Sequence, residues 1–165
     1  MLQVKSSTQN KRIIIICERL NHLFKDNTDF WKEVLSYNND FHLSNINGLM
    51  LHEFLHSSNL VVEVLTYKNY FTRANGYTKP KFKNKMWLNT AKFGRSDSSI
   101  AATIAHETIH NLDTTILEYN FGHGDNYDTP EKENCAPQWF ASLAYKYLSE
   151  GIVSEKNSHG KEFIA

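Results

Sequence analysis

The stretch SSIAATIAHETIHNLD at residues 98–113 carries the clearest pattern in this chain of 165 residues. Apolar side chains recur along it and just beyond it in steps of four, three and four residues: Ala105, Ile109, Leu112 and Ile116. This spacing predicts an α-helix with one side in the core, capped by Asp97 or Ser98 and ending near Leu117. A helix of this kind must lie against other elements, so we expect the fold to form around it.

Three shorter helices are expected in the first third of the chain. RIIIICERLNHLFKD (12–26) begins as a β-branched run and continues with helical spacing. DFWKEVLSY (29–37) and LSNINGLMLHEFLHSS (43–58) have the pattern of a second and a third helix. The caps expected for these two helices are Asp29 and Ser44. Residues 1–10 are polar and are expected to be loose.

The composition then changes to that of β-strands. NLVVEVLTYK (59–68) is rich in β-branched and aromatic residues, which favours a strand. NGYT (75–78) supplies a turn and a short strand. In KMWLNT (85–90), apolar and polar residues alternate, which is typical of a half-buried strand. The sequence therefore predicts a small sheet before the long helix.

The chain ends in a loop and one further helix. Residues 120–134 are rich in glycine and polar residues and are expected to form a loop. Apolar spacing predicts a last helix at about 135–148, and the polar tail 151–165 is expected to be loose. Helices, a small sheet and further helices make an α+β fold, which we expect to be a single domain over residues 1–165.

Charge and composition argue against several classes of partner. Eighteen basic and eighteen acidic residues cancel, and the basic residues look scattered, so we expect no nucleic-acid or membrane partner. The longest apolar run, IIIIC (13–17), is too short to cross a bilayer. No secretory signal begins the sequence, so a cytoplasmic location is expected, with signal-independent export left open. Cys17 and Cys135 lie far apart, which suits a reducing compartment and leaves one disulfide open.

The string H-E-x-x-H occurs twice, at His52–His56 and at His106–His110. Histidines four residues apart lie on the same side of a helix, one turn apart, so both can reach one ion. Zinc binds imidazole nitrogens at about 2.0–2.1 Å. A glutamate after the first histidine then lies beside the open position of the metal, where it can take a proton from bound water.

The surroundings of the two strings differ. Around His106 and His110 the flanking residues are small or uncharged, and the expected helix extends well before and after them. The helix that carries the first string is expected to stop just after it, with bulky apolar neighbours of ordinary core type. We therefore predict a zinc site at the second string, with Glu107 as general base. The side chains expected to face solvent instead are His52, Glu53 and His56.

A catalytic zinc usually has three protein ligands and a water. The loop after the long helix contains His123, and the chain that precedes it can span about 20 Å when extended, enough to return to the metal. Gly122 and Gly124 allow sharp turns on either side. We predict His123 as the third ligand and leave Glu133 and Asp125 as alternatives.

These residues resemble the zincin superfamily of metallopeptidases. HETIHNLD…FGHGD looks like the metzincin pattern H-E-x-x-H-x-x-G-x-x-H with the third histidine further away, and it also resembles small bacterial and phage zincin-like proteins. The segments WLNTAKFGRSDSSIAATIAHETIH and FGHGDN…CAPQWFASLA carry the second likeness, and the resemblance covers about residues 67–148. It implies three zinc (Zn²⁺) ligands and a general base: His106, His110, His123 and Glu107.

The resemblance also implies a fold and an activity. In zincins a twisted sheet precedes the active helix and an edge strand lines the cleft, and we expect residues 87–90 in that place. The implied activity is that of a zinc metallopeptidase acting on a protein or peptide substrate. The alternative is a zincin-like binding or interaction module, with structural zinc or none and no catalytic activity.

Two roles near the motif stay open. Gln138 stands where the small zincins have a tyrosine, so Tyr127 and Tyr145 are the candidates for stabilising an oxyanion. Asp113 follows His110 by three residues and would either orient a liganding imidazole or be a surface charge.

Overall fold

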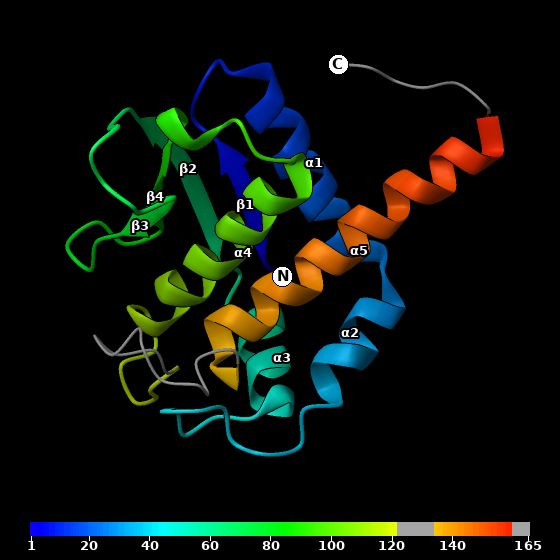
Figure 1. Cartoon of the computed structure of the whole chain (residues 1–165). Coiled ribbons are helices and arrows are strands. Elements are labelled where there is room, and N and C mark those ends of the chain that lie inside the picture. The colour runs from blue at the N-terminus through cyan, green and yellow to red at the C-terminus, as the bar shows by residue number, and fades with distance from the viewer. Residues whose placement is uncertain (122–133, 160–165) are drawn as a thin grey trace.

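The computed structural model describes residues 1–121 and 134–159, with the backbone alone described from residue 150 onward. Within these residues the chain has an α+β fold, as predicted, with five α-helices and a four-stranded sheet (Figure 1). In chain order the elements are β1 (Gln3–Ser6), α1 (Lys11–Asp26), α2 (Thr28–Leu35), α3 (Gly48–Ser57), β2 (Val61–Tyr67), β3 (Gly76–Thr78), β4 (Lys85–Asn89), the 3-10 helix η1 (Thr90–Lys92), α4 (Asp97–Asp113) and α5 (Ala136–His159).

The sheet has the strand order β1-β2-β4-β3. Strands β1, β2 and β4 are parallel, and β3 is antiparallel to β4 at one edge. Because side chains alternate along a strand, one face of the sheet gathers the buried residues. These are Val4, Val62, Val64, Met86 and Leu88. Helices α1 and α4 pack on the sheet, and α5 packs against α4 (Figure 1).

The first ten residues are not loose, contrary to our expectation, and neither are residues 151–159, which continue helix α5. Gln3–Ser6 pair in parallel with Val61–Val64 as the edge strand β1. Leu2 and Val4 are both 2% exposed, so the strand is anchored in the core. The polar residues of β1 led to the wrong prediction because an edge strand needs only every second side chain buried.

Asparagines cap the three N-terminal helices. The whole of α1 is helical, including its β-branched start, because the Asn10 side chain accepts hydrogen bonds from the backbone N–H groups of Arg12 and Ile13. Asn27 and Asn47 cap α2 and α3 in the same way, so the expected caps at Asp29 and Ser44 were wrong. Asn27 lies two residues from Asp29, and Asn47 lies three residues from Ser44.

Helix α4 forms at the centre of the molecule as its spacing predicted. Its cap is Ser96, whereas we expected Asp97 or Ser98. Ser96 Oγ accepts a hydrogen bond from the backbone N–H of Ser99 at 3.2 Å. It ends at Asp113, four residues before the expected end, and the hydroxyls of Thr114 and Thr115 then donate to the Asn111 carbonyl. The apolar side predicted from the sequence is buried: Ala105, Ile109 and Leu112.

Strand β3 lies close to α4 because it begins with a glycine. A Cβ atom on Gly76 would lie 3.0 Å from Thr103 Cγ2 and 3.1 Å from the Trp87 carbonyl oxygen. A larger residue would push the edge strand away from the helix. Gly76 therefore sets the distance between β3 and the side of α4 that carries the histidines.

The two cysteines are buried free thiols, so no disulfide joins Cys17 to Cys135. Burial, with a smaller contribution from Glu18, raises the pKa of the Cys17 thiol to about 12. Burial also raises the pKa of Cys135. Among the helices of the described residues, none combines the length and the apolar character needed to cross a bilayer.

Candidate metal site on helix α4

Helix α4 brings the two histidines of the second string together. The Nε2 atoms of His106 and His110 lie 3.2 Å apart, with ring centroids separated by 4.9 Å. Two nitrogens bound to one tetrahedral zinc at about 2.0–2.1 Å would be about 3.3–3.4 Å apart. The separation also allows an N–H···N hydrogen bond between the rings. The pair thus fits two positions of a zinc site without any rearrangement of the helix.

The third ligand predicted from the sequence lies outside the described residues. This holds for His123 and for both alternatives, Asp125 and Glu133, as well as for Tyr127. Within residues 1–121 and 134–149, no group of three or more histidine, cysteine, aspartate or glutamate side chains gathers that could hold a metal ion. The complete ligand set therefore stays a prediction.

Glu107 is a buried carboxyl group with a defined partner. The residue is 8% exposed, and Thr78 Oγ1 of β3 donates to its Oε2 at 2.8 Å. Asn111 Nδ2 donates to the Glu107 carbonyl oxygen at 3.0 Å, one turn further along α4. Burial raises the pKa of Glu107 to about 7, while the hydrogen bond from Thr78 acts in the opposite direction. The carboxyl group is therefore oriented by β3 before any ligand arrives.

A cleft of about 670 Å³ runs along this side of α4. Among the described residues, its walls come from the loop and strand around β3, from Arg95 and the adjoining side of α4, and from the start of α5. The lining residues are Arg73, Ala74, Asn75, Gly76, Arg95, Ser99, Ala102, Thr103, His106, Glu107, Gln138 and Ala141. His106 and Glu107 thus lie in one open space that can admit a ligand.

The edge strand beside the cleft is β3, whereas we expected residues 87–90 in this place. Strand β4 lies inside the sheet, between β2 and β3. Asn75 and Gly76, at the start of β3, line the cleft. The prediction failed because β3 has three residues and its antiparallel return puts it outside β4.

The structure gives Asp113 and Tyr145 surroundings that the sequence did not predict. Asp113 accepts a hydrogen bond from the Phe121 backbone N–H at 3.4 Å, and burial raises the pKa of its carboxyl group. Asp113 thus fixes the chain that follows α4 to the end of this helix. Tyr145 is 47% exposed on α5 and does not line the cleft, whereas Gln138 does.

Both histidines of the first H-E-x-x-H string pack against α2, whereas we expected the string to face solvent. The rings of His52 and His56 lie 5.3 Å and 4.7 Å from that of Trp31, and 4.2 Å from each other. His56 Nε2 is buried without a hydrogen-bond partner among the described residues. Only Glu53 has the exposed position that we expected. Burial lowers the pKa of both histidines.

Sequence reasoning missed the cations of the cleft. Eight of the eighteen basic residues lie between Glu63 and Asp97, where the sequence has no acidic residue, so the basic residues are not scattered. Arg73 and Arg95 of this acid-free segment line the cleft. The missing acidic residues were the signal that could have identified them. Thr78 left no such signal, because its contact with Glu107 joins residues 29 positions apart.

Comparisons of the chain with protein-family models, with curated proteins and with solved structures find no match in any of the three. The assignment of a function therefore rests on the residues of the site.

Proposed function

We propose that this protein is a zinc-dependent hydrolase that cleaves peptide bonds. His106 and His110 are two of its zinc ligands, His123 is the third, and Glu107 is the general base. The observation that carries the proposal is the 3.2 Å separation of the two Nε2 atoms, next to a buried carboxyl group in an open cleft. A purely structural pair of histidines would not need that cleft.

The chemistry divides between the ion and the chain. Zinc held by histidines acts as a Lewis acid and lowers the pKa of a bound water towards 7. Glu107 takes the proton from the attacking water and returns it to the leaving nitrogen. Thr78 holds Glu107 Oε2 at 2.8 Å, so the carboxylate keeps one orientation through both transfers. A cation nearby favours the ionised carboxylate and opposes the effect of burial on its pKa.

Strand β3 favours an extended peptide as the substrate. In the sheet of the described residues β3 pairs with β4 alone, and Asn75 and Gly76 border the cleft. A peptide that adds to this edge as a further strand would run past His106 and Glu107. An edge strand along the cleft is also what the zincin resemblance implies, and it supports the peptidase assignment.

Gln138 is our candidate for stabilising the tetrahedral oxyanion. It lines the cleft from the first turn of α5, at the position where the small zincins have a tyrosine. Its side-chain amide is a neutral hydrogen-bond donor of the kind found in oxyanion holes. Tyr145 loses this role because it lies outside the lining of the cleft.

The proposal is tested by metal analysis together with cleavage of a mixed peptide library, read by mass spectrometry. Glu107→Gln should keep the zinc of the wild type and lose cleavage by at least about a hundredfold, because it removes the base and leaves the ligands. Glu53→Gln, the same change in the first string, is the matched control and should cleave normally.

Two results would count against the hydrolase. Full cleavage by Glu107→Gln would exclude this glutamate as the base. Stoichiometric zinc with no cleavage of any library peptide by the wild type would favour the zincin-like binding module.

A further inference from the structure

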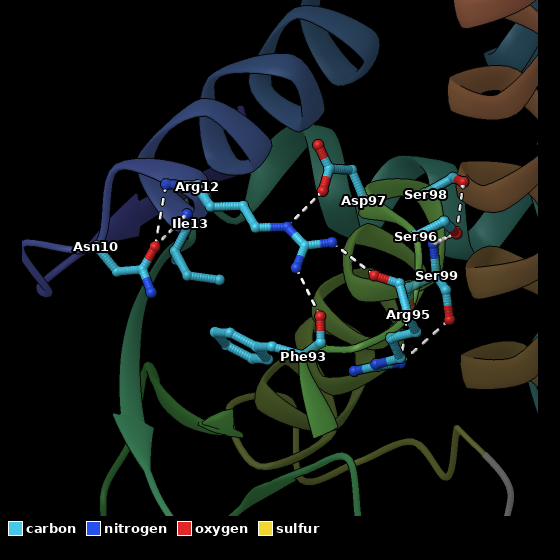
Figure 2. Close-up of polar contacts among 9 residues, drawn as sticks. All are labelled: Asn10, Arg12, Ile13, Phe93, Arg95, Ser96, Asp97, Ser98 and Ser99. Atoms are coloured by element: carbon cyan, nitrogen blue, oxygen red, sulfur yellow. Dashed lines mark hydrogen bonds and ion pairs between the residues drawn. The ribbon is translucent and has the colours of Figure 1, made fainter. Parts of the chain in front are cut away.

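Arg95 lies in the cleft with part of its guanidinium already engaged. Its Nη1 donates to the Ser99 carbonyl oxygen at 2.9 Å and to Thr103 Oγ1 at 2.7 Å. Figure 2 shows the side chain lying along the start of α4, with its hydrogen-bonded nitrogen towards Ser99. These contacts fix the plane of the guanidinium against the helix.

The other edge of the Arg95 guanidinium has no hydrogen-bond partner among the described residues. Nε and Nη2 are both shielded from solvent and donate to no acceptor in the described part of the chain. The nearest acidic residue in sequence, Asp97, is paired with Arg12 at 2.6 Å. Burial, with a smaller contribution from the charge of Arg12, lowers the pKa of Arg95. A desolvated cation edge without a hydrogen-bond acceptor is unfavourable, so an anionic group would find strong attraction here.

The geometry of that edge selects the kind of anion. In a guanidinium group, the Nε–H and one Nη2–H point in the same direction and form a fork. This fork matches the two oxygens of a carboxylate and gives two parallel charge-assisted hydrogen bonds. Because Nη1 is occupied by Ser99 and Thr103, the free edge of Arg95 is the one that suits a carboxylate.

The loop that carries Arg95 is held firmly by helix α1. Arg12 donates from Nε to Asp97 Oδ1 at 2.6 Å, from Nη1 to the Phe93 carbonyl oxygen at 2.6 Å, and from Nη2 to the Arg95 carbonyl oxygen at 2.5 Å (Figure 2). Two of these hydrogen bonds hold the backbone carbonyls of Phe93 and Arg95, and the third holds the side chain of Asp97. A ligand group that binds Arg95 therefore meets a site that is ordered in advance, which lowers the entropic cost of binding.

The charge around Arg95 also favours an anion. The acid-free segment between Glu63 and Asp97 supplies the eight cations Lys68, Arg73, Lys79, Lys81, Lys83, Lys85, Lys92 and Arg95. Arg73 lines the cleft together with Arg95, and within the described part of the lining Glu107 is the single acidic residue. A cleft lined mainly by one sign of charge concentrates ligands of the opposite sign.

The distance along α4 relates Arg95 to the catalytic group. Arg95 contacts Thr103, and Glu107 follows Thr103 by four residues, which is about 6 Å of helical rise. An extended peptide advances about 3.3 Å per residue. A carboxylate on the free edge of Arg95 would thus belong to a residue about two positions from the bond beside Glu107.

We propose that Arg95 determines specificity by binding a carboxylate of the substrate about two residues from the cleaved bond. The substrate class is then an acidic peptide, in which the carboxylate comes from an aspartate or glutamate side chain or from the C-terminus. That this peptide is a substrate rests on the proposed hydrolase function, whereas binding of its carboxylate does not require cleavage.

The test is a binding measurement on the Glu107→Gln variant, which cannot turn peptides over. Fluorescein-labelled octapeptides of one sequence are compared by anisotropy, with glutamate or glutamine at one internal position and a free or an amidated C-terminus. The best acidic peptide should bind about tenfold more tightly than the neutral, amidated one, the gain expected of a bidentate ion pair in a cleft. Dependence on the internal glutamate or on the free C-terminus identifies the source of the carboxylate.

Variants then assign the preference to Arg95. In the Glu107→Gln background, Arg95→Gln should reduce the tenfold preference to twofold or less. Lys83→Gln, an exposed cation of the same segment outside the cleft, is the matched control and should keep it. Arg95→Lys keeps the charge without the fork and should lose most of the preference. Thr103→Val keeps Arg95 and its hydrogen bond to the Ser99 carbonyl oxygen but removes the one to Thr103 Oγ1. The guanidinium is then held less firmly and the acidic preference should fall, so this variant serves if Arg95→Gln does not fold.

The outcomes separate this inference from the proposed function. Equal binding of acidic and neutral peptides, or an unchanged preference in both Arg95→Gln and Arg95→Lys, overturns the role of Arg95. Cleavage of the library without any acidic preference overturns it too, while the hydrolase stands. An Arg95-dependent preference in a protein that cleaves nothing supports the carboxylate site and counts against the hydrolase.

Discussion

Glu107 is the residue on which the site depends most. A carboxyl group that is 8% exposed is normally paired with a cation or held by several donors, yet here the donor to its Oε2 is the hydroxyl of Thr78. It follows a histidine whose Nε2 faces that of His110, and it borders a cleft. This combination suits a group that exchanges a proton with a ligand, and it is poorly suited to a purely structural role.

Thr78→Val tests the positioning of Glu107 by β3. Valine has nearly the shape of threonine but cannot donate, so Oε2 loses the hydrogen bond that orients it. We expect peptide cleavage to fall about tenfold with zinc content unchanged, in the range seen for residues that orient a metal site from outside it. Thr66→Val on strand β2, which β4 separates from β3, is the control. Thr78→Val with full activity would show that β3 does not position the carboxylate.

The core of the site was predictable from the sequence because its members are neighbours along one helix. His106, Glu107 and His110 lie within five residues, and helical geometry alone places them on adjacent positions. Thr78 and Gln138 reach the same cleft from β3 and α5, and only the folded chain shows that. Arg95 was within reach, since it lies twelve residues before Glu107 and continues the four-residue spacing of that side of α4.

The surroundings of helix α3 could not be predicted from the residue pattern of that helix alone. Its spacing predicted that the histidine side would face water, but Trp31 of α2 covers that side and is itself 8% exposed. The packing of α2 on α3 depends on the turn between them and on residues far from the string. The same limit explains why the sequence misplaced the sheet edge, since the order of strands depends on long-range pairing.

The two adjacent histidines of α3, His52 and His56, predict a pH-dependent stability. Burial lowers the pKa of His52 and His56 below the usual 6.5, although Glu53 raises that of His52 and the charge of His52 lowers that of His56 further. Near pH 6.5 and below, the unfolded chain therefore binds more protons than the folded protein. The free energy of unfolding should fall as the pH drops through this range, and the stability is retained above it.

Urea unfolding between about pH 8 and about pH 5.5 measures this effect. The His52→Gln/His56→Gln double variant should lose less stability over this range than the wild type. If both proteins lose the same amount, the two histidines do not account for the pH dependence.

The net charge of the whole molecule is zero, but its charges are distributed unevenly along the chain. Eight cations and no acidic residue lie between Glu63 and Asp97, so the rest of the chain carries ten basic and eighteen acidic residues. The cationic segment includes β3, β4 and the loop before α4, and these elements form or support one wall of the cleft. The fold thus joins the proposed metal site to a wall that attracts anions, and binding of an acidic peptide should weaken as salt is added.

The central claim is that His106 and His110 hold one zinc ion in this cleft. The most direct test is a crystal structure of the wild-type protein grown with one equivalent of zinc, with anomalous scattering to identify the ion. We predict a single zinc at about 2.0–2.1 Å from the Nε2 atoms of both histidines, with a coordination position on the Glu107 side that no protein atom fills. A folded, zinc-saturated protein with the ion bound elsewhere, or with four protein ligands around it, would contradict the account.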